Sequence, residues 1–163
     1  MAVQIISIVI VLAIVVYFLR KENRKEQKYF GKKVEPDRKE KKILARYKQE
    51  YEPISADERL ATLDRDKWEL EDIAKNATEI VYDHPIPAKS ERQNLKPGDL
   101  VKLHFMIEEE GETETERMWV QVTGEKDGLF SGTLDNDPFN EILKAGQLIW
   151  FHANHVSHID RNK

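Results

Sequence analysis

Apolar residues fill the start of the chain almost without interruption. Residues 2–19 (AVQIISIVIVLAIVVYFL) contain no charged residue, no proline and no glycine. A helix of this length spans ~27 Å at ~1.5 Å per residue, close to the ~30 Å hydrocarbon core of a bilayer, so the pattern predicts a transmembrane helix. A cleaved signal peptide is the alternative, but it needs a basic segment before the apolar run and small residues at its cleavage site. The run instead ends in Tyr17, Phe18 and Leu19.

A dense group of basic residues follows the apolar run and predicts its orientation. The group comprises Arg20, Lys21, Arg24, Lys25, Lys28, Lys32 and Lys33. Because basic residues beside the end of a transmembrane helix stay in the cytoplasm, we expect residues 20–163 to be cytoplasmic. The chain has no cysteine, which agrees with a reducing compartment and excludes disulfides and thiolate chemistry.

The next segment, residues 20–53, is a charged stem that Gly31 and Pro36 interrupt. Its second half is predicted to be helical over Lys39–Tyr51, because apolar side chains there fall on one helical stripe. That stripe consists of Ile43, Leu44, Tyr47 and Tyr51.

Residues 54–84 form a second region with helical signals. Ser55 and Glu58 have the spacing of a capping box, which predicts a helix from about Ala56. Its apolar residues would include Leu60, Leu63, Trp68 and Leu70, with a break or bend near residues 64–67. The prolines of the segment 83–87 end this helical region, since proline lacks an amide donor and restricts its predecessor.

From about Lys96 the apolar period changes from helical to alternating. The alternation predicts five short strands, at residues 100–107, 117–123, 129–134, 147–151 and 155–159. Residues 108–116 are expected to be an acidic hairpin loop and residues 139–143 a short helix. Short strands at this spacing are typical of a small barrel, so residues 85–163 are predicted to form a mostly antiparallel, SH3-like β-barrel. The fold class is therefore α+β, with an N-terminal transmembrane helix and a helical stem.

The net charge of −4 hides two opposite halves. Residues 20–50 carry a net charge of +7, and residues 51–163 carry −11. Anionic headgroups attract each nearby Lys or Arg by ~1 kcal/mol, so the stem is expected to bind membrane lipids while the acidic part is held off the bilayer. Because acids dilute the basic stem and the remainder is acidic, we expect no nucleic-acid binding.

Four blocks of sequence carry a resemblance to a known family. In order they are residues 97–103 (PGDLVKL), 116–123 (ERMWVQVT), 130–138 (FSGTLDNDP) and 143–151 (LKAGQLIWF). Together they resemble the YegJ-like domains, number 2314 in the series of domains of unknown function, over about residues 86–160. The resemblance implies a small, mostly β domain of bacterial origin with no assigned reaction. In a bacterium the predicted anchor would lie in the inner membrane.

Three histidines near the end of the chain are weak candidates for a metal site. His152, His155 and His158 stand three residues apart, with Asp160 nearby. A 3₁₀ turn would place two of them on the same side, where imidazole and carboxylate are ordinary zinc ligands. A strand would put residues three apart on opposite faces. Exposed turn and strand histidines are the simpler interpretation, and we predict no metal and no cofactor.

Four residues of the predicted barrel are candidates for a partner-binding surface, namely Trp119, Asp135, Asp137 and Trp150. Trp119 alternates with Met118 and Val120, so its side chain should face away from theirs. Small barrels bind extended or Pro-rich peptides in aromatic-lined grooves, and the carboxylates of the Asp-Asn-Asp-Pro turn would shape the rim. Core packing of the tryptophans and a plain turn are the alternatives.

The acidic hairpin at residues 108–116 is either a solvated surface or a docking site for a basic partner. No nucleophile elbow, P-loop, zinc-protease motif or dinucleotide-binding turn occurs in the chain, so we do not expect an enzyme. The favoured hypothesis is a single-pass membrane protein whose β domain is a protein-interaction module. The alternatives are an immunity or accessory protein that binds a basic partner and, less favoured, a metal-dependent enzyme that uses the histidines.

Overall fold

A computed structural model describes residues 36–82, 84–109 and 111–161 of the chain. The chain divides into two compact units, Met1–Asp37 and Arg38–Lys163, and the second contains every helix and strand discussed below. The predicted anchor at residues 2–19 and the basic residues 20–33 lie outside the described residues. Among the helices of the described part, none combines the length and the apolar character needed to cross a membrane.

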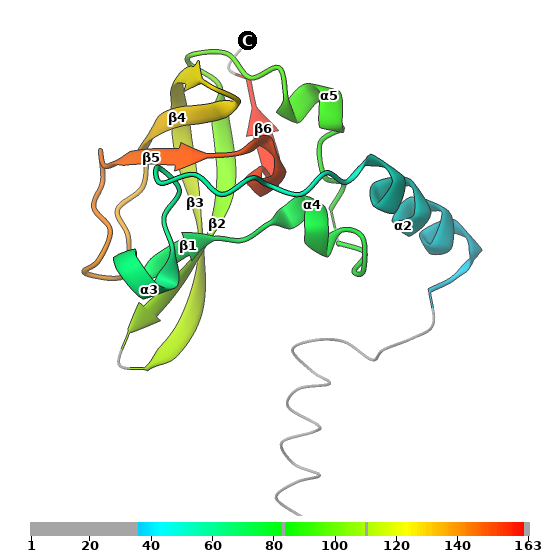
Figure 1. The fold of residues 1–163 in the computed structure, drawn as a ribbon, viewed down its shortest axis with the longest axis horizontal. Helices are drawn as coiled ribbons and strands as arrows, with labels where there is room; N and C mark the ends of the chain where they lie inside the picture. The colour runs from blue at the N-terminus through cyan, green and yellow to red at the C-terminus, as the bar shows by residue number, and fades with distance from the viewer. Residues whose placement is uncertain (1–35, 83, 110, 162–163) are drawn as a thin grey trace, which may run out of the picture. The chain divides into compact units, whose positions relative to one another are not determined.

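One antiparallel sheet dominates the second unit and curves into a half-barrel (Figure 1). The strands follow the order β1-β2-β3-β4-β5, and β6 also pairs with β2. Their bounds are β1 Trp68–Leu70, β2 Leu100–Glu109, β3 Glu112–Lys126, β4 Leu129–Leu134, β5 Leu148–Phe151 and β6 His158–Asp160. The prediction of a mostly antiparallel β domain is thus confirmed.

Strand β2 pairs along both of its edges. β3 follows one edge over the whole strand, from Leu100 opposite Gln121 to Glu109 opposite Glu112. On the other edge β6 pairs with residues 100–102, and β1 pairs with residues 105–107. Two short strands placed end to end therefore satisfy the backbone groups that would otherwise form an open edge.

The hydrophobic core lies on the concave face of the sheet and follows the predicted alternation. Fully buried side chains include Val101, Leu103 and Phe105 of β2, Met118, Val120 and Val122 of β3, and Ile149 and Phe151 of β5. Phe130 stacks on Phe151 across the β4–β5 pair, with the ring centroids 5.6 Å apart. Alternation predicted these strands because each one turns its apolar side chains toward the core on one face.

The helix predicted from Ala56 does not form. Residues 52–62, which we call the strap, contain no regular helix or strand and run beside β5 (Figure 1). The carboxylate of Asp57 accepts both the backbone N–H and the guanidinium of Arg59, at 2.9 and 2.8 Å, so a local turn replaces the predicted capping box. The strap is then held by Asn154, whose side-chain amide donates to the Glu52 carbonyl at 2.9 Å.

Residues 54–84 are therefore not a separate helical region. They supply β1 to the sheet, and Trp68 enters the main core 5.6 Å from the Phe105 ring. The remaining helices there and just beyond are single turns, namely α3 Leu63–Asp66, α4 Ile73–Asn76 and α5 Lys89–Arg92. Pairing of Trp68 and its neighbours with β2 overrides the local helical spacing.

Helix α2 (Arg38–Glu50) confirms the helix that was predicted in the stem. Its Tyr47 packs into a second, smaller apolar cluster with Ile73, Ala77 and Ile86. A buried polar contact links the segment after β1 to the convex face of the sheet, where the Glu71 Oε2 atom lies 2.6 Å from His104 Nδ1. Hydrogen bonding to His104 lowers the pKa of the Glu71 carboxyl.

Two predicted loop assignments at the far end of the sheet also differ from the structure. Residues 108–116 are mostly strand, because β2 and β3 continue to a turn at Gly111, whose φ is +84°. Residues 139–143 form no helix. The Asn140 side-chain oxygen instead accepts the backbone N–H groups of Ile142 and Leu143, at 3.0 and 2.8 Å, and this local arrangement competes with a helical turn.

Gly132 on β4 leaves no space for a side chain, and this generates a prediction. A Cβ atom there would lie 2.5 Å from Val120 Cγ1 and 2.6 Å from the Gln121 backbone oxygen. Because relief requires the backbone of β3 to move, we expect Gly132→Ala to lower the free energy of unfolding by ~1–3 kcal/mol in urea titrations. Gly124→Ala is the matched control, since its Cβ would meet only Ser131 Oγ at 3.4 Å. Equal stabilities of the two variants would contradict the argument.

Candidate functional site

Trp119 lies on the convex face of the sheet, away from Met118 and Val120, which are buried in the core. Its ring is already engaged there, with Lys102 Nζ 4.4 Å from the ring centroid and the His158 ring at 5.7 Å. The Asn136 side-chain oxygen accepts the backbone N–H of Trp119. The residue is half-buried, and its flat face is covered by a cation from its own sheet.

Trp150 occupies a different part of the convex face. Trp150 pairs with Ser131 across the β4–β5 ladder. The Trp119 backbone carbonyl instead accepts the backbone N–H of Asp135, which lies four residues after Ser131 on the chain. The guanidinium carbon of Arg59 sits 4.8 Å from the Trp150 ring centroid. The four predicted binding residues therefore do not form one surface around the two tryptophans. Asp135 and Asp137 are exposed in the turn after β4.

The three histidines make separate contacts. His152 Nδ1 accepts the Asn154 backbone N–H, and His155 Nδ1 accepts the His152 backbone N–H, both at 3.1 Å. His158 is exposed and packs on Trp119. Across residues 36–82, 84–109 and 111–161, no three His, Cys, Asp or Glu side chains are grouped as metal ligands would be. The metal-dependent alternative consequently has no assembled site in the described part of the chain.

An acidic groove lies where the β2–β3 hairpin projects beyond the core. It has a volume of about 880 Å³ and is lined by Glu108, Glu109, Glu112, Glu114, Phe139, Asn140, Glu141 and Ile142. A smaller hollow of about 200 Å³ adjoins it and includes Ile107 and Glu116. We call the surface formed by these residues the acidic groove.

Hairpin carboxylates hold the far wall of the acidic groove in place. The Phe139 backbone N–H donates to both oxygens of Glu116, at 3.2 and 3.3 Å, and the Asn140 side-chain amide donates to the same carboxylate at 3.0 Å. The Glu141 backbone N–H donates to Glu109 Oε1 at 3.4 Å. These bonds fix the loop with the Phe139 side chain 99% exposed, so a large apolar ring is presented to solvent.

The electrostatic character of the acidic groove is negative. Glu108 forms an ion pair with Lys67 at 3.3 Å. Glu112, Glu114 and Glu141 form no ion pair within the part of the chain that the structure describes. The groove thus combines uncompensated carboxylates with an exposed aromatic ring, which is a surface suited to a cationic and partly apolar ligand.

Sequence reasoning named the acidic hairpin but missed Phe139. The sequence does indicate which way the glutamates face. Glu112, Glu114 and Glu116 occupy every second position of the strand, in the same series as Met118. Residues of that series face the concave side, so the carboxylates continue the core face beyond the point where apolar residues end. The exposure of Phe139 depends on the bonds to Glu116 and Glu109, which no local pattern predicts.

His155 generates a prediction on stability. Only 5% of the residue is exposed, and burial lowers the pKa of its imidazole to about 3. At pH 7 the ring is neutral in both states, but at pH 5 the unfolded chain binds a proton that the folded chain does not, so stability falls as pH falls from about 6.5. Titration of this single group should lower the free energy of unfolding by about 2 kcal/mol between pH 7 and pH 5.

The measurement is urea unfolding of the wild type and His155→Gln at both pH values. The wild type should be the more stable at pH 7, and its advantage should shrink by about 2 kcal/mol at pH 5, because the variant lacks the titrating ring. A stability difference that stays constant between the two pH values would contradict the prediction.

No family model, curated protein or solved structure matches the chain. The resemblance to the YegJ-like domains and the function it implies therefore stay predictions.

Proposed function

We propose that this protein is a membrane-tethered interaction module whose SH3-like β domain binds a basic, partly apolar segment of a partner protein in the acidic groove. The observation that carries the proposal is the fully exposed Phe139 ring, held by backbone bonds to hairpin carboxylates. The ring stands beside the carboxylates of the acidic groove, so a ligand that brings a cation to those carboxylates can also gain by covering the ring. The SH3-like assignment is supported by the curved antiparallel sheet and its short strands.

Electrostatic attraction and burial of the Phe139 ring together define the partner. Uncompensated carboxylates attract Lys and Arg side chains and repel anionic partners, which favours fast and selective encounter. Burying the Phe139 ring under an apolar side chain contributes about 1.5–3 kcal/mol, and a guanidinium over the exposed ring contributes about 0.5–1 kcal/mol. A segment that alternates basic and apolar residues would satisfy both requirements at once.

The predicted tryptophan surface is less well suited to this role. Lys102 and His158 already contact Trp119, and Arg59 already covers Trp150. A ligand would have to displace these contacts, whereas Phe139 offers an uncovered ring. The geometry thus favours a basic partner, which the immunity or accessory alternative also requires.

The membrane part of the proposal concerns residues 2–19 as a single-pass anchor in the inner membrane, with the basic stem on the cytoplasmic lipid surface. Tethering would raise the effective concentration of the groove toward partners in the same membrane. The hydropathy of the sequence is what supports this part.

A binding experiment tests the acidic groove. The full chain in phosphatidylcholine nanodiscs is titrated with a fluorescent peptide of alternating Lys and Phe, at low and high salt. We expect binding at low salt that is largely lost at 0.5 M NaCl, because screening weakens exposed charge pairs. Phe139→Ser should weaken binding by about tenfold, in line with the loss of one buried aromatic contact.

The double variant Glu112→Lys with Glu114→Lys should weaken binding at least as strongly. Its matched control is Glu79→Lys with Glu125→Lys, which makes the same change in net charge at exposed sites outside the groove. Equal loss of affinity in both double variants would mean that net charge alone attracts the peptide, and the proposed site would be wrong.

Membrane extraction tests the anchor. We expect the full chain to remain in the membrane pellet after alkaline carbonate treatment, and a variant without residues 2–19 to be extracted, since a spanning apolar helix resists conditions that release surface-bound proteins. Mass spectrometry of the mature chain distinguishes the signal-peptide alternative. An intact chain in the supernatant, or a chain shortened after the apolar run, would contradict the proposal.

A further inference from the structure

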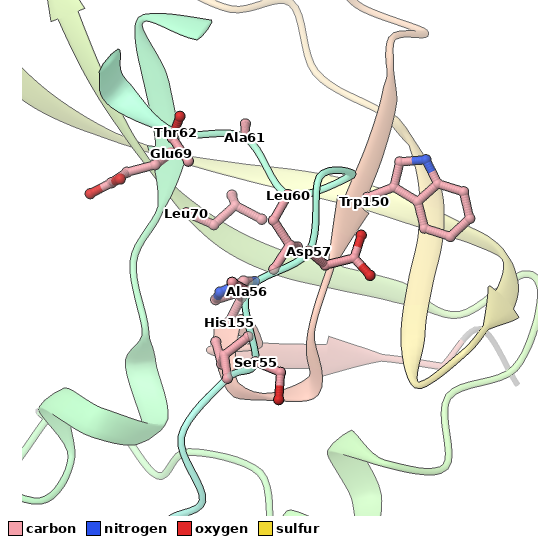
Figure 2. Close-up of a pocket in the computed structure, with 11 residues that line it drawn as sticks. Ser55, Ala56, Asp57, Leu60, Ala61, Thr62, Glu69, Leu70, Trp150 and His155 are labelled. Carbon is pink, nitrogen blue, oxygen red and sulfur yellow. The ribbon is translucent and has the colours of Figure 1, made fainter. Parts of the chain in front are cut away.

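A second cavity lies where the half-barrel is open, between β1 and β5 and beneath the strap (Figure 2). Its volume is about 250 Å³. We call this cavity the seam pocket. Its lining combines apolar side chains of the strap and of β1 with Trp150 and with His155 from the 3₁₀ turn Ala153–His155. It is separate from the acidic groove, with which it shares no lining residue.

His155 offers one hydrogen-bond donor to the seam pocket. Its Nδ1 accepts the His152 backbone N–H at 3.1 Å, so in the neutral ring the proton resides on Nε2. No partner for this Nε2–H is found in the described part of the chain. The residue is 95% buried, and its ring lines the pocket, so a ligand there can accept this bond. This Nε2 atom is not one of the buried side-chain atoms that lack a partner, so it is open to the pocket, where an acceptor on a ligand can take the place of water.

The other lining residues determine the chemical character of the rest of the ligand. Ile54, Leu60 and Leu70 provide apolar surface. The charge of Asp57 at the rim is already compensated, since both of its oxygens bind the Arg59 guanidinium at 2.8 and 2.7 Å. The Arg59 guanidinium also lies over the Trp150 ring, so its charge is already engaged in contacts within the protein.

Charged ligands fit these walls poorly. An anion would find only a neutral imidazole as donor, because the Arg59 guanidinium is already bound to Asp57. A cation has no use for an N–H donor and would give up its hydration against apolar walls. A neutral molecule avoids both penalties.

We propose that the seam pocket binds small neutral molecules that combine an apolar ring with one carbonyl acceptor, and that the acceptor receives the Nε2–H of His155. The volume suits a single ring, because pockets for drug-sized ligands start at about 300 Å³. A ligand of this size should bind with a Kd of about 1 mM.

The test uses three probes that share a six-membered ring, namely cyclohexanone, cyclohexanecarboxylate and cyclohexylammonium. Each is titrated into the full chain in nanodiscs, labelled with ¹⁵N in histidine and tryptophan. Cyclohexanone should shift the His155 Nε2 and Trp150 indole resonances in a saturable way. The two charged probes should bind at least tenfold more weakly.

Two alanine substitutions make the test specific. Ala56 is exposed and lines the pocket, so Ala56→Phe should block cyclohexanone without disturbing the core. Ala145→Phe places the same ring at an exposed turn outside the pocket and should leave binding unchanged. Unsaturable shifts, equal responses to all three probes, or undiminished binding by Ala56→Phe would each overturn the proposal. Because neither substitution touches the acidic groove, peptide binding there remains an independent measurement.

Discussion

Backbone hydrogen bonding along β2 joins parts of the chain that are far apart in sequence. β3 occupies one edge, while β6 from the end of the chain and β1 from before the sheet share the other. The Glu71 amide, which donates to the His104 carbonyl, and the Ser157 amide, which donates to the Lys102 carbonyl, fill the gap between those two short strands. The core face of β2 is consequently fixed at every position, and this fixes which residues of β3 face inward.

The acidic groove follows from that register. Beyond Ile107 and Met118 the hairpin has no core left to cover, and the inward positions change from apolar residues to glutamates. Charges on a projecting hairpin also discourage pairing with the edges of other sheets, which is a sufficient reason for the glutamates alone. It does not account for Phe139, because an exposed phenylalanine favours association. The proposed binding surface depends on the combination of the glutamates with the exposed Phe139 ring.

Strand positions could be predicted from the sequence because each strand buries one face, so alternation marks it directly. The prediction of β4 agrees with the structure at both ends, and α2 was found from its apolar stripe. The strap could not be predicted, because the spacing of Ser55 and Glu58 is a local signal, whereas Trp68 pairs with Ile107 far along the chain. The separation of Trp119 from Trp150 likewise depends on register across three strands.

The acidic groove and the basic residues 20–33 carry opposite charges. A groove that attracts a basic segment through uncompensated carboxylates also repels anionic lipid headgroups. The basic residues 20–33, in contrast, are predicted from their charge to be attracted to those headgroups. In the proposed interaction Phe139 would add the selectivity that charge alone lacks, since only a segment with an apolar group at the right position gains from covering its ring.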